Sequence, residues 1–443
     1  MTTFLDIGVV RVQRYIGRWP QLRGRRGASA LVSTVLDTGH LSAVIKNRAR
    51  TNPAAGSVDG VLSLEVIAGD PASLAADLIA EIRGLMPAAE LEATWADGDD
   101  YWIAYAQIAA RRSRGDCIVS LPLSSGFPLL KICDLCAMDP AVISLRVIDE
   151  QRDACADCAA RCEQPNVSPI ERRLTDATGL KIATDFNHLA ELGFDSKRNH
   201  LATVYADGNA FGAFFAALLK SGLAKDGVSA QLNEATWTAL IEAAELISQD
   251  SQICRVLPHV VGGDDVLVSV PASHAWLFTR TYLQRFNELT AAAVAELGDP
   301  SLPAPTASAS IVLAHSSWPF NAAADLAADL LARAKRVGAG TVSTIGWLEV
   351  TRRGTNIGDA LPPIALETLN DWAPNIGRII TDLTSTVRYT FEQQLDGNDP
   401  SSAMLEVKTT ANRLGYTSLV FPEQSPTWDL RSALDIARWW SHS

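Results

Sequence analysis

The sequence predicts an α+β fold of several domains, and three observations lead to that prediction. The chain has 443 residues, which at about 150 residues per domain corresponds to two or three domains. From residue 200 onward, strand and helix patterns follow the order β-α-β-β-α-β with one extra helix inserted, which is the order of a ferredoxin-like domain. Between residues 127 and 165, two Cys-x-x-Cys pairs indicate a small metal-binding module.

Composition excludes two classes of protein. With 47% hydrophobic and 20% charged residues, the chain carries enough apolar surface to fold, which excludes disorder over its whole length. No stretch approaches the about 18 uninterrupted apolar residues of a membrane span. The first ten residues contain Asp6 and no basic residue, so they do not read as a signal peptide. We therefore expect a cytoplasmic protein with no membrane partner.

Residues 1–126 mix strand and helix patterns. Strands are predicted at Phe4–Val10, Val61–Ile67 and Leu91–Trp95, and a helix at Pro71–Met86. A two-layer α/β domain accounts for this order. A mostly helical, polar connector is predicted at 166–199, after the metal module.

A basic segment stands out because the net charge of the chain is −12. Nine basic residues lie between positions 11 and 50, opposed only by Asp37. Two interpretations stay open: a solvated helix face, or contact with a nucleic-acid backbone or an acidic subunit. The candidate contact residues are the arginines Arg11, Arg14, Arg18, Arg23, Arg25 and Arg26.

Five of the seven cysteines fall in one short window. Cys133, Cys136, Cys155 and Cys158 have the spacing C-x2-C-x18-C-x2-C, which is typical of a structural zinc site. Each pair sits on a tight turn that points two thiolates at one ion. Cys162 is a possible substitute for Cys155 or Cys158. All four coordination positions would be filled by protein, so no catalytic role is predicted for this ion.

Residues 200–350 are the most informative region. Strands are predicted at 201–205, 256–261, 266–270, 307–314 and 341–349, with helices at 210–221, 229–249, 276–297 and 321–336. The second and third strands form a hairpin that turns at Gly262-Gly263-Asp264-Asp265. Residues 351–443 are predicted to form a helical C-terminal domain.

The position of Asp207 suggests a chemical role for the hairpin tip. Taken alone, the tetrapeptide is an ordinary turn sequence. In a ferredoxin-like sheet, however, the first strand lies beside the hairpin, so Asp207 should converge with Asp264 and Asp265. Three such carboxylates repel one another unless cations neutralise them. Two magnesium or manganese ions are the usual solution, and they serve in-line attack on phosphorus.

Further residues fit a nucleotide site. Gly262 and Gly263 would let a nucleotide approach the backbone, and Gly208 and Asn209 follow the first carboxylate. Lys335, near the end of a predicted helix, could reach a triphosphate, although a basic residue is also favoured there electrostatically. Ser308 could contact a base edge, or it could be an ordinary strand hydroxyl. No P-loop is present, so a Walker-type NTPase is not indicated.

Several motifs resemble the large subunit of type III CRISPR effector complexes. They are ATVYADGNAFGAFF at 202–215, VVGGDDVLVSV at 260–270, the stretch 308–335 with His315, Pro319 and Lys335, the opening 7–33, and the zinc module from Phe127. The resemblance implies two ferredoxin-like palm domains of the GGDEF-cyclase type, the first non-catalytic, with a zinc module and helical domains. In that family, the catalytic palm joins ATP into cyclic oligoadenylate when target RNA is bound.

The resemblance assigns roles residue by residue. It implies that Asp207, Asp264 and Asp265 hold the metal ions, that the Gly208 carbonyl assists, that Lys335 contacts phosphate and that Ser308 reads adenine. No His-Asp dipeptide occurs, so the nuclease activity of many relatives is not expected. Guide and target RNA would be contacted through other subunits.

The predicted function is therefore a nucleotidyltransferase that makes cyclic oligoadenylate from ATP within an RNA-guided defence complex. Two alternatives remain at this point. One is a stand-alone defence nucleotide cyclase, and the other is a scaffold subunit that binds nucleotide without turning it over.

Overall fold

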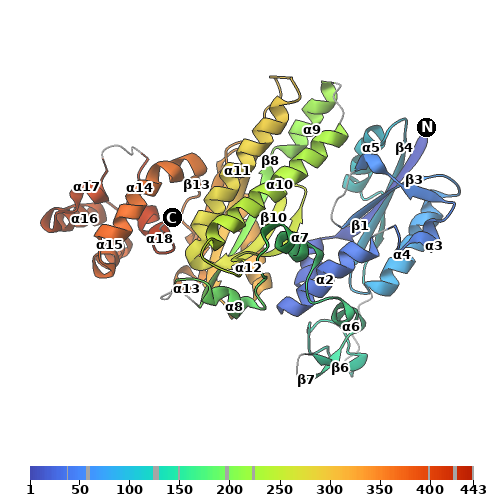
Figure 1. Ribbon diagram of the computed structural model, residues 1–443, viewed down its shortest axis with the longest axis horizontal. Helices are drawn as coiled ribbons and strands as arrows, with labels where there is room; N and C mark the ends of the chain where they lie inside the picture. Colours follow the sequence, from blue (N-terminus) through green and yellow to red (C-terminus); the bar gives the residue numbers. More distant parts are fainter. Residues whose placement is uncertain are drawn as a thin grey trace.

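The computed structural model describes residues 1–36, 38–55, 60–122, 129–147, 150–194, 199–221, 225–397, 400–422 and 427–441. Figure 1 shows an elongated molecule in which an N-terminal α/β unit, a central α/β unit and a C-terminal group of helices follow one another. The predicted α+β fold is confirmed. The predicted domain boundary between residues 126 and 127 lies within 123–128, outside the described residues. Phe127, Asp37 and part of the predicted 166–199 connector are also outside them.

The N-terminal unit is built on a five-stranded sheet in the order β2-β3-β1-β4-β5. Its centre is the apolar strand β1, whose residues Phe4 to Val9 are all buried. Leu5 and Ile7 pack under α2 and α4, whereas Phe4 packs under α5 on the opposite face. The strands are β1 (Thr2–Val10), β2 (Ala49–Thr51), β3 (Val61–Val66), β4 (Glu90–Gly98) and β5 (Ile118–Ser120). The helices are α1 (Val12–Gly17), α2 (Leu22–Val35), α3 (Ser42–Ile45), α4 (Pro71–Leu85) and α5 (Tyr101–Ser113), with a 3-10 turn at Pro53–Ala55.

The metal module is a hairpin of β6 (Ile143–Val147) and β7 (Glu150–Ala154) followed by α6 (Ala156–Glu163). It lies against α2 of the N-terminal unit (Figure 1). A Cβ at Gly27 would fall 2.3 Å from the Arg161 carbonyl oxygen, so the close approach of α2 and α6 requires glycine there. The connector contains α7 (Pro169–Thr178), which begins with a Ser168–Glu171 capping box, and α8 (Phe186–Glu191).

The central unit has a six-stranded sheet in the order β13-β12-β11-β8-β10-β9. The part β11-β8-β10-β9 has the order of a ferredoxin-like domain, while β12, parallel to β11, and β13 extend it. The strands are β8 (His200–Asn209), β9 (Leu257–Gly262), β10 (Asp265–Pro271), β11 (Thr306–His315), β12 (Thr344–Glu349) and β13 (Ile364–Ala365). The prediction ended the first strand at Tyr205. It in fact runs to Asn209, because β11 pairs with it along that whole length.

Helices cover both faces of this sheet. Odd- and even-numbered side chains of β11 lie on opposite faces of the sheet. Ala309 and Ile311 pack with α10 and α11, whereas Val312 packs in the cluster that contains α12 residues and Tyr205. Tyr205 therefore lies on the α12 face. The helices are α9 (Phe211–Lys220), α10 (Lys225–Ser248), α11 (Ala275–Ala295) and α12 (Phe320–Val337), with a 3-10 turn at Ala272–His274.

The C-terminal helices dock on the central unit through buried charge. Glu349, at the end of β12, accepts a hydrogen bond from Trp439 at 2.9 Å, and Asp435 accepts one from Trp347 at 2.8 Å. Arg353 pairs with Asp435 at 2.9 Å, which compensates a buried carboxylate. The elements are α13 (Val350–Arg353), α14 (Leu366–Asp382), α15 (Ser385–Gly397), α16 (Pro400–Leu414), α17 (Thr417–Val420) and α18 (Leu430–Ala437), with a 3-10 turn at Ile357–Asp359. Among the described residues, none of the helices combines the length and apolar composition that a membrane crossing requires.

Candidate nucleotide and metal sites

The structure brings the three predicted carboxylates to one edge of the central sheet. Asp207 lies near the end of β8, Asp264 lies in the hairpin turn, and Asp265 begins β10. The register pairs Ala206 with Val266, so β8 ends where the hairpin turns. Because β8 and β10 are antiparallel neighbours, the convergence follows from sheet order alone.

The three carboxylates repel one another. Burial, followed by the charge of Asp207, raises the pKa of Asp264 to about 6. Burial, followed by the charges of Asp207 and Asp264, raises the pKa of Asp265 to about 7. Near neutral pH, protons therefore compete for these carboxylates until a cation replaces them. Their oxygens do not form a closed cage within 4.8 Å, so the described structure shows three neighbouring carboxylates rather than a formed cation site.

Lys335 and Gly208 complete this edge. The Lys335 ammonium is paired with the Asp207 carboxylate and donates to the Gly208 carbonyl oxygen at 2.7 Å. A Cβ at Gly208 would fall 2.6 Å from Asp264 Oδ2 and 2.3 Å from the Phe211 ring. Only glycine keeps that space open. The all-oxygen donor set of three carboxylates and one carbonyl fits a hard divalent cation such as magnesium.

The glycine turn is held by the helix behind it. Gly263 adopts φ +62°, a left-handed conformation that favours glycine. Its N–H donates to Asn233 Oδ1 at 3.2 Å, and its carbonyl accepts from Thr236 at 2.7 Å. Gly262 pairs with Asp265 at the end of the hairpin. The turn is therefore fixed by α10, with the Gly263 surface exposed.

Two of the predicted nucleotide contacts, Ser308 and Asn209, have their side chains inside the sheet. The Ser308 side chain is fully buried, and its hydroxyl accepts from Asn209 Nδ2 at 3.0 Å and contacts Thr344 Oγ1 at 3.1 Å. Asn209 is also buried and donates to Thr306 at 3.0 Å. Both side chains join β8 to β11 and do not line the cleft. These contacts favour the strand-hydroxyl alternative for Ser308, and its contact with a base remains a prediction.

A cleft of about 1290 Å³ lies between the N-terminal and central units. The central unit contributes Asp264, Asp265 and the Phe211 and Phe215 rings of α9. The N-terminal unit contributes the opposite wall from α1 and from α5; its lining includes Arg11, Gln13, Arg14, Trp102 and Tyr105. One wall is thus acidic and the other basic and aromatic. The aromatic wall was missed by sequence reasoning, because its position depends on how the two units pack.

The N-terminal sheet repeats the order of the central sheet without its carboxylates. In each unit the central strand ends at a residue with left-handed backbone, Arg11 (φ 55°) after β1 and Ala210 (φ 59°) after β8. Counting back from these residues, Gly8 takes the place of Asp207. Gly8 pairs with Val61, which takes the place of Asp265. The N-terminal unit therefore has no carboxylate at these two positions, and the prediction of a non-catalytic first palm remains a prediction.

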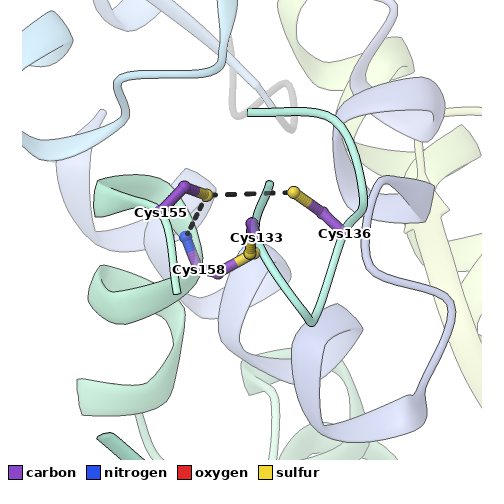
Figure 2. Close-up of side chains that lie close together, drawn as sticks. All are labelled: Cys133, Cys136, Cys155 and Cys158. Atoms are coloured by element: carbon purple, nitrogen blue, oxygen red, sulfur yellow. Dashed lines mark hydrogen bonds between the residues drawn. The ribbon is translucent and has the colours of Figure 1, made fainter. Parts of the chain in front are cut away.

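The second candidate site is the cysteine cluster. Cys133, Cys136, Cys155 and Cys158 are buried, and their sulfur atoms all lie within 4.8 Å of one another. Figure 2 shows the four side chains converging from the loop before β6 and from the start of α6. The Cys136 and Cys155 sulfurs are 3.8 Å apart. These four residues could hold a metal ion, and Cys162, which is less buried, is not part of the group.

Four of the six candidate contact arginines in the basic segment have partners within the chain. Arg18 pairs with Asp139, and Arg23 donates to the Cys162 and Gln164 carbonyls. Arg26 is buried and pairs with buried Glu171 at 2.7 Å. Arg25 is buried with its guanidinium 3.2 Å from the Phe320 ring centroid. These four arginines hold neighbouring elements together, because each finds a partner across an interface.

Only Arg11 and Arg14 of that set have largely exposed side chains, at 63% and 70% exposed. Both approach Glu90, at 3.2 Å and 3.6 Å, in surface pairs of small energetic value. They also line the cleft. They are the members of the set that remain available to a nucleic acid or an acidic partner.

Residues 200–340 match the family model described as Cas10/Cmr2, second palm domain. The chain is Cas10-like. The predicted resemblance to the large subunit of type III CRISPR complexes is thereby confirmed. The match spans β8 to the end of α12 and includes all three carboxylates and Lys335.

Solved structures show that the Cas10-like fold extends over the whole chain. The chain resembles a Csm1–Csm4 cassette in complex with cA4, with TM-score 0.56 and 14% identity over 99% of this chain and 69% of that chain. The apo Csm1–Csm4 cassette gives TM-score 0.57 and 15% identity, covering 99% and 70%. Csm1 of T. onnurineus gives TM-score 0.53 and 13% identity, covering 99% and 69%. No curated protein matches the chain in sequence.

The cysteine cluster generates the first prediction. We expect about one tightly bound zinc per chain, because four buried thiolates form a closed tetrahedral donor set. Cys133→Ser should lose the zinc and lower the solubility of the protein. Cys162→Ser should keep it, because Cys162 lies outside the group. Metal analysis of protein purified without chelator measures both; zinc-free wild-type protein would contradict the prediction.

The raised pKa values of Asp264 and Asp265 generate the second prediction. In the folded protein, Asp264 and Asp265 hold protons at pH values where the unfolded chain, with an ordinary pKa near 3.8, has released them. Their contribution to the free energy of unfolding therefore falls as pH rises from about 4 through the folded values of about 6 and 7. Without added divalent cation, the melting temperature of wild type relative to Asp264→Asn/Asp265→Asn should fall between pH 5 and 8. Added magnesium should reverse this trend for wild type only. Parallel curves for the two proteins would contradict the prediction.

The third prediction concerns the exposed arginines. Arg11→Glu/Arg14→Glu should leave the melting temperature unchanged and weaken binding of single-stranded RNA, an effect that shrinks between about 50 and about 300 mM salt as counterion release is lost. The control Arg378→Glu/Arg413→Glu makes the same charge change on exposed residues of α14 and α16. Fluorescence anisotropy measures the binding. Equal affinities at low salt would leave Arg11 and Arg14 as a solvated face.

Proposed function

We propose that this Cas10-like chain joins ATP into cyclic oligoadenylate, as the large subunit of an RNA-guided type III CRISPR complex. The observation that carries the proposal is the convergence of Asp207, Asp264 and Asp265 at one edge of the palm sheet, where Asp264 and Asp265 line the cleft. Such a group has no structural benefit, because burial and the charge of Asp207 raise the pKa of both Asp264 and Asp265. A site that gathers half-buried like charges is suited to a cationic ligand.

The protein residues supply the parts that phosphoryl transfer requires. Asp207, Asp264 and Asp265, with the Gly208 carbonyl, would hold two magnesium or manganese ions. Those ions, when bound, lower the barrier by neutralising charge on the attacking 3′-oxygen and the leaving pyrophosphate. Lys335 carries a fixed positive charge to the same edge, where it can pass from Asp207 to a phosphate oxygen. The exposed Gly263 turn leaves room for a nucleotide beside the backbone.

The size of the cleft supports a joining reaction. Pockets for one small ligand measure about 300 to 1000 Å³. The cleft between the two palms measures about 1290 Å³, which is room for a donor and an acceptor nucleotide together. The basic and aromatic wall on the N-terminal side, with Arg11, Arg14 and Trp102, suits a second triphosphate and base.

The related structures support the same substrate class. The Csm1–Csm4 cassette has been solved with ATP, with pppApA and with the products cA3 and cA4. These ligands belong to those proteins, and we extend them to this chain on the strength of the shared fold and the three carboxylates. A Csm4-like subunit and the guide and target RNA would be its partners in the complex, and a structural zinc would occupy the cysteine cluster.

The test is incubation of the pure protein with ATP, magnesium or manganese, and candidate RNA or partner subunits, with products identified by mass spectrometry. Cyclic oligoadenylate formed only with the RNA and subunits supports the full proposal. The same product from the chain alone supports a stand-alone cyclase. ATP binding without any product under every condition supports a nucleotide-binding scaffold.

Asp264→Ala/Asp265→Ala should reduce product formation at least about 1000-fold, since the lost charge stabilisation is worth about 4 kcal/mol of barrier. The variant should fold, with equal or higher metal-free stability, because a repulsion is removed. ATP binding should weaken much less. Asp329→Ala/Asp371→Ala, which removes two exposed carboxylates outside the cleft, serves as the control. A folded GGDD double variant with wild-type turnover would show that the hairpin is only a turn.

A further inference from the structure

A tyrosine connects the hairpin carboxylate to the other palm. The Tyr205 hydroxyl lies 3.2 Å from Asp265 Oδ1 and 2.5 Å from Gln13 Nε2. Asp265 belongs to the hairpin of the central unit, whereas Gln13 belongs to α1 of the N-terminal unit. The pair of bonds is therefore an interdomain contact that ends on a carboxylate of the proposed site.

The direction of these bonds is fixed by chemistry. When Asp265 is ionised, as it must be to bind a cation, its carboxylate can only accept, so the phenolic O–H donates to it. The Gln13 amide N–H then donates to the phenolic oxygen. Each bond strengthens the other, because a phenol that accepts a hydrogen bond is a better donor. The chain of hydrogen bonds runs from Gln13 through Tyr205 to Asp265 without a break.

The strand places Tyr205 for this role. Side chains two residues apart share one face of a strand, so Tyr205 and Asp207 point to the same side of β8. The register pairs Tyr205 with Leu267, which makes Asp265 its diagonal neighbour, within reach of a long side chain. The ring packs against the apolar cluster that Val312 forms with Ala323 and Ala327 of α12. Its hydroxyl is therefore held in place rather than free to turn.

The position of Gln13 depends on the backbone before α1 and on the contacts that α1 makes with the central unit. The residue before α1, Arg11, has a left-handed backbone (φ 55°, ψ 50°), a conformation that is unfavourable for any residue other than glycine. At the other end of α1, a Cβ at Gly17 would lie 3.7 Å from Asn321 Cβ, at the start of α12. Val260 of β9 packs against the N-terminal core. The two units are thus in close contact at α1, which carries Gln13, and at the neighbouring α2.

We infer that Tyr205 and Gln13 position Asp265 for metal binding, so that the non-catalytic palm helps to set the geometry of the catalytic one. They are positioning residues, since each would act on the metal ion only through Asp265. The inference rests on the proposed function for its link to turnover. Its primary measurement, manganese binding, does not require turnover.

The test compares Tyr205→Phe and Gln13→Leu with wild type in the full-length protein. Isothermal titration with Mn²⁺ alone should show about 10-fold weaker binding for Tyr205→Phe, the usual effect of losing an outer hydrogen bond to a metal ligand. Gln13→Leu should weaken binding about 3-fold, because the phenol remains. In turnover, both should lower kcat and leave KM for ATP within about 2-fold.

A matched control and a double variant make the result specific. Tyr101 donates to the buried Asp6 carboxylate at 3.1 Å in the N-terminal unit, so Tyr101→Phe removes a phenol from the same kind of pair away from the site. It should leave Mn²⁺ binding and kcat unchanged. Gln13→Leu should have no further effect in the Tyr205→Phe background, because Gln13 acts through the phenol.

The outcomes separate this inference from the proposed function. Wild-type Mn²⁺ binding by folded Tyr205→Phe overturns the inference. An additive effect of Gln13→Leu in the double variant overturns the part played by Gln13. If wild type binds Mn²⁺ and Asp264→Ala/Asp265→Ala does not, yet no oligoadenylate forms under any condition, the proposed function fails while the titrations still decide the role of Tyr205.

Discussion

Mutual repulsion among three carboxylates is the constraint on which the rest of the central unit depends. Asp207, Asp264 and Asp265 are brought together by antiparallel pairing of β8 and β10, and burial makes their charges costly. In the structure, the Lys335 ammonium pairs with Asp207 and neutralises part of that charge. One ammonium cannot neutralise three carboxylates, so this edge of the sheet keeps an excess of negative charge. That excess suits it to cations and, under the proposed function, to a metal-bound nucleotide.

The surrounding residues hold this unfavourable arrangement in place. Gly208 has no side chain because Asp264 and Phe211 occupy the space a Cβ would need. Asn233 and Thr236 of α10 fix the backbone of Gly263. The buried Asn209 and Ser308 side chains tie β8 to β11 just beyond Asp207. Two residues that the sequence suggests as nucleotide contacts therefore contribute to the stiffness of the sheet.

Local patterns were sufficient to predict the parts of this molecule whose geometry is local. The spacing of Cys133, Cys136, Cys155 and Cys158 fixes a cluster on two turns, and the GGDD hairpin with Asp207 fixes the carboxylate edge through strand order. Arg25 and Arg26 could not be predicted in this way. A run of arginines has the same sequence pattern whether it faces water or, as here, meets Phe320 and Glu171 of distant elements. Tyr205 carried a usable signal, its two-residue spacing from Asp207, whereas Gln13 carried none.

Under the proposed function, the relation between the two palms gives a reason for one chain to carry both. Their sheets share strand order and a left-handed residue after the central strand, but Gly8 and Val61 stand where the central unit has Asp207 and Asp265. The proposed joining of two nucleotides would require unequal treatment of them: one must have its phosphorus attacked beside cations, and the other must present a hydroxyl. A cleft with carboxylates on one wall and arginines and aromatic rings on the other provides that inequality. The first palm has no carboxylates at these positions, which is consistent with different roles for the two walls. The hydrogen bond from Gln13 to Tyr205 joins the two walls.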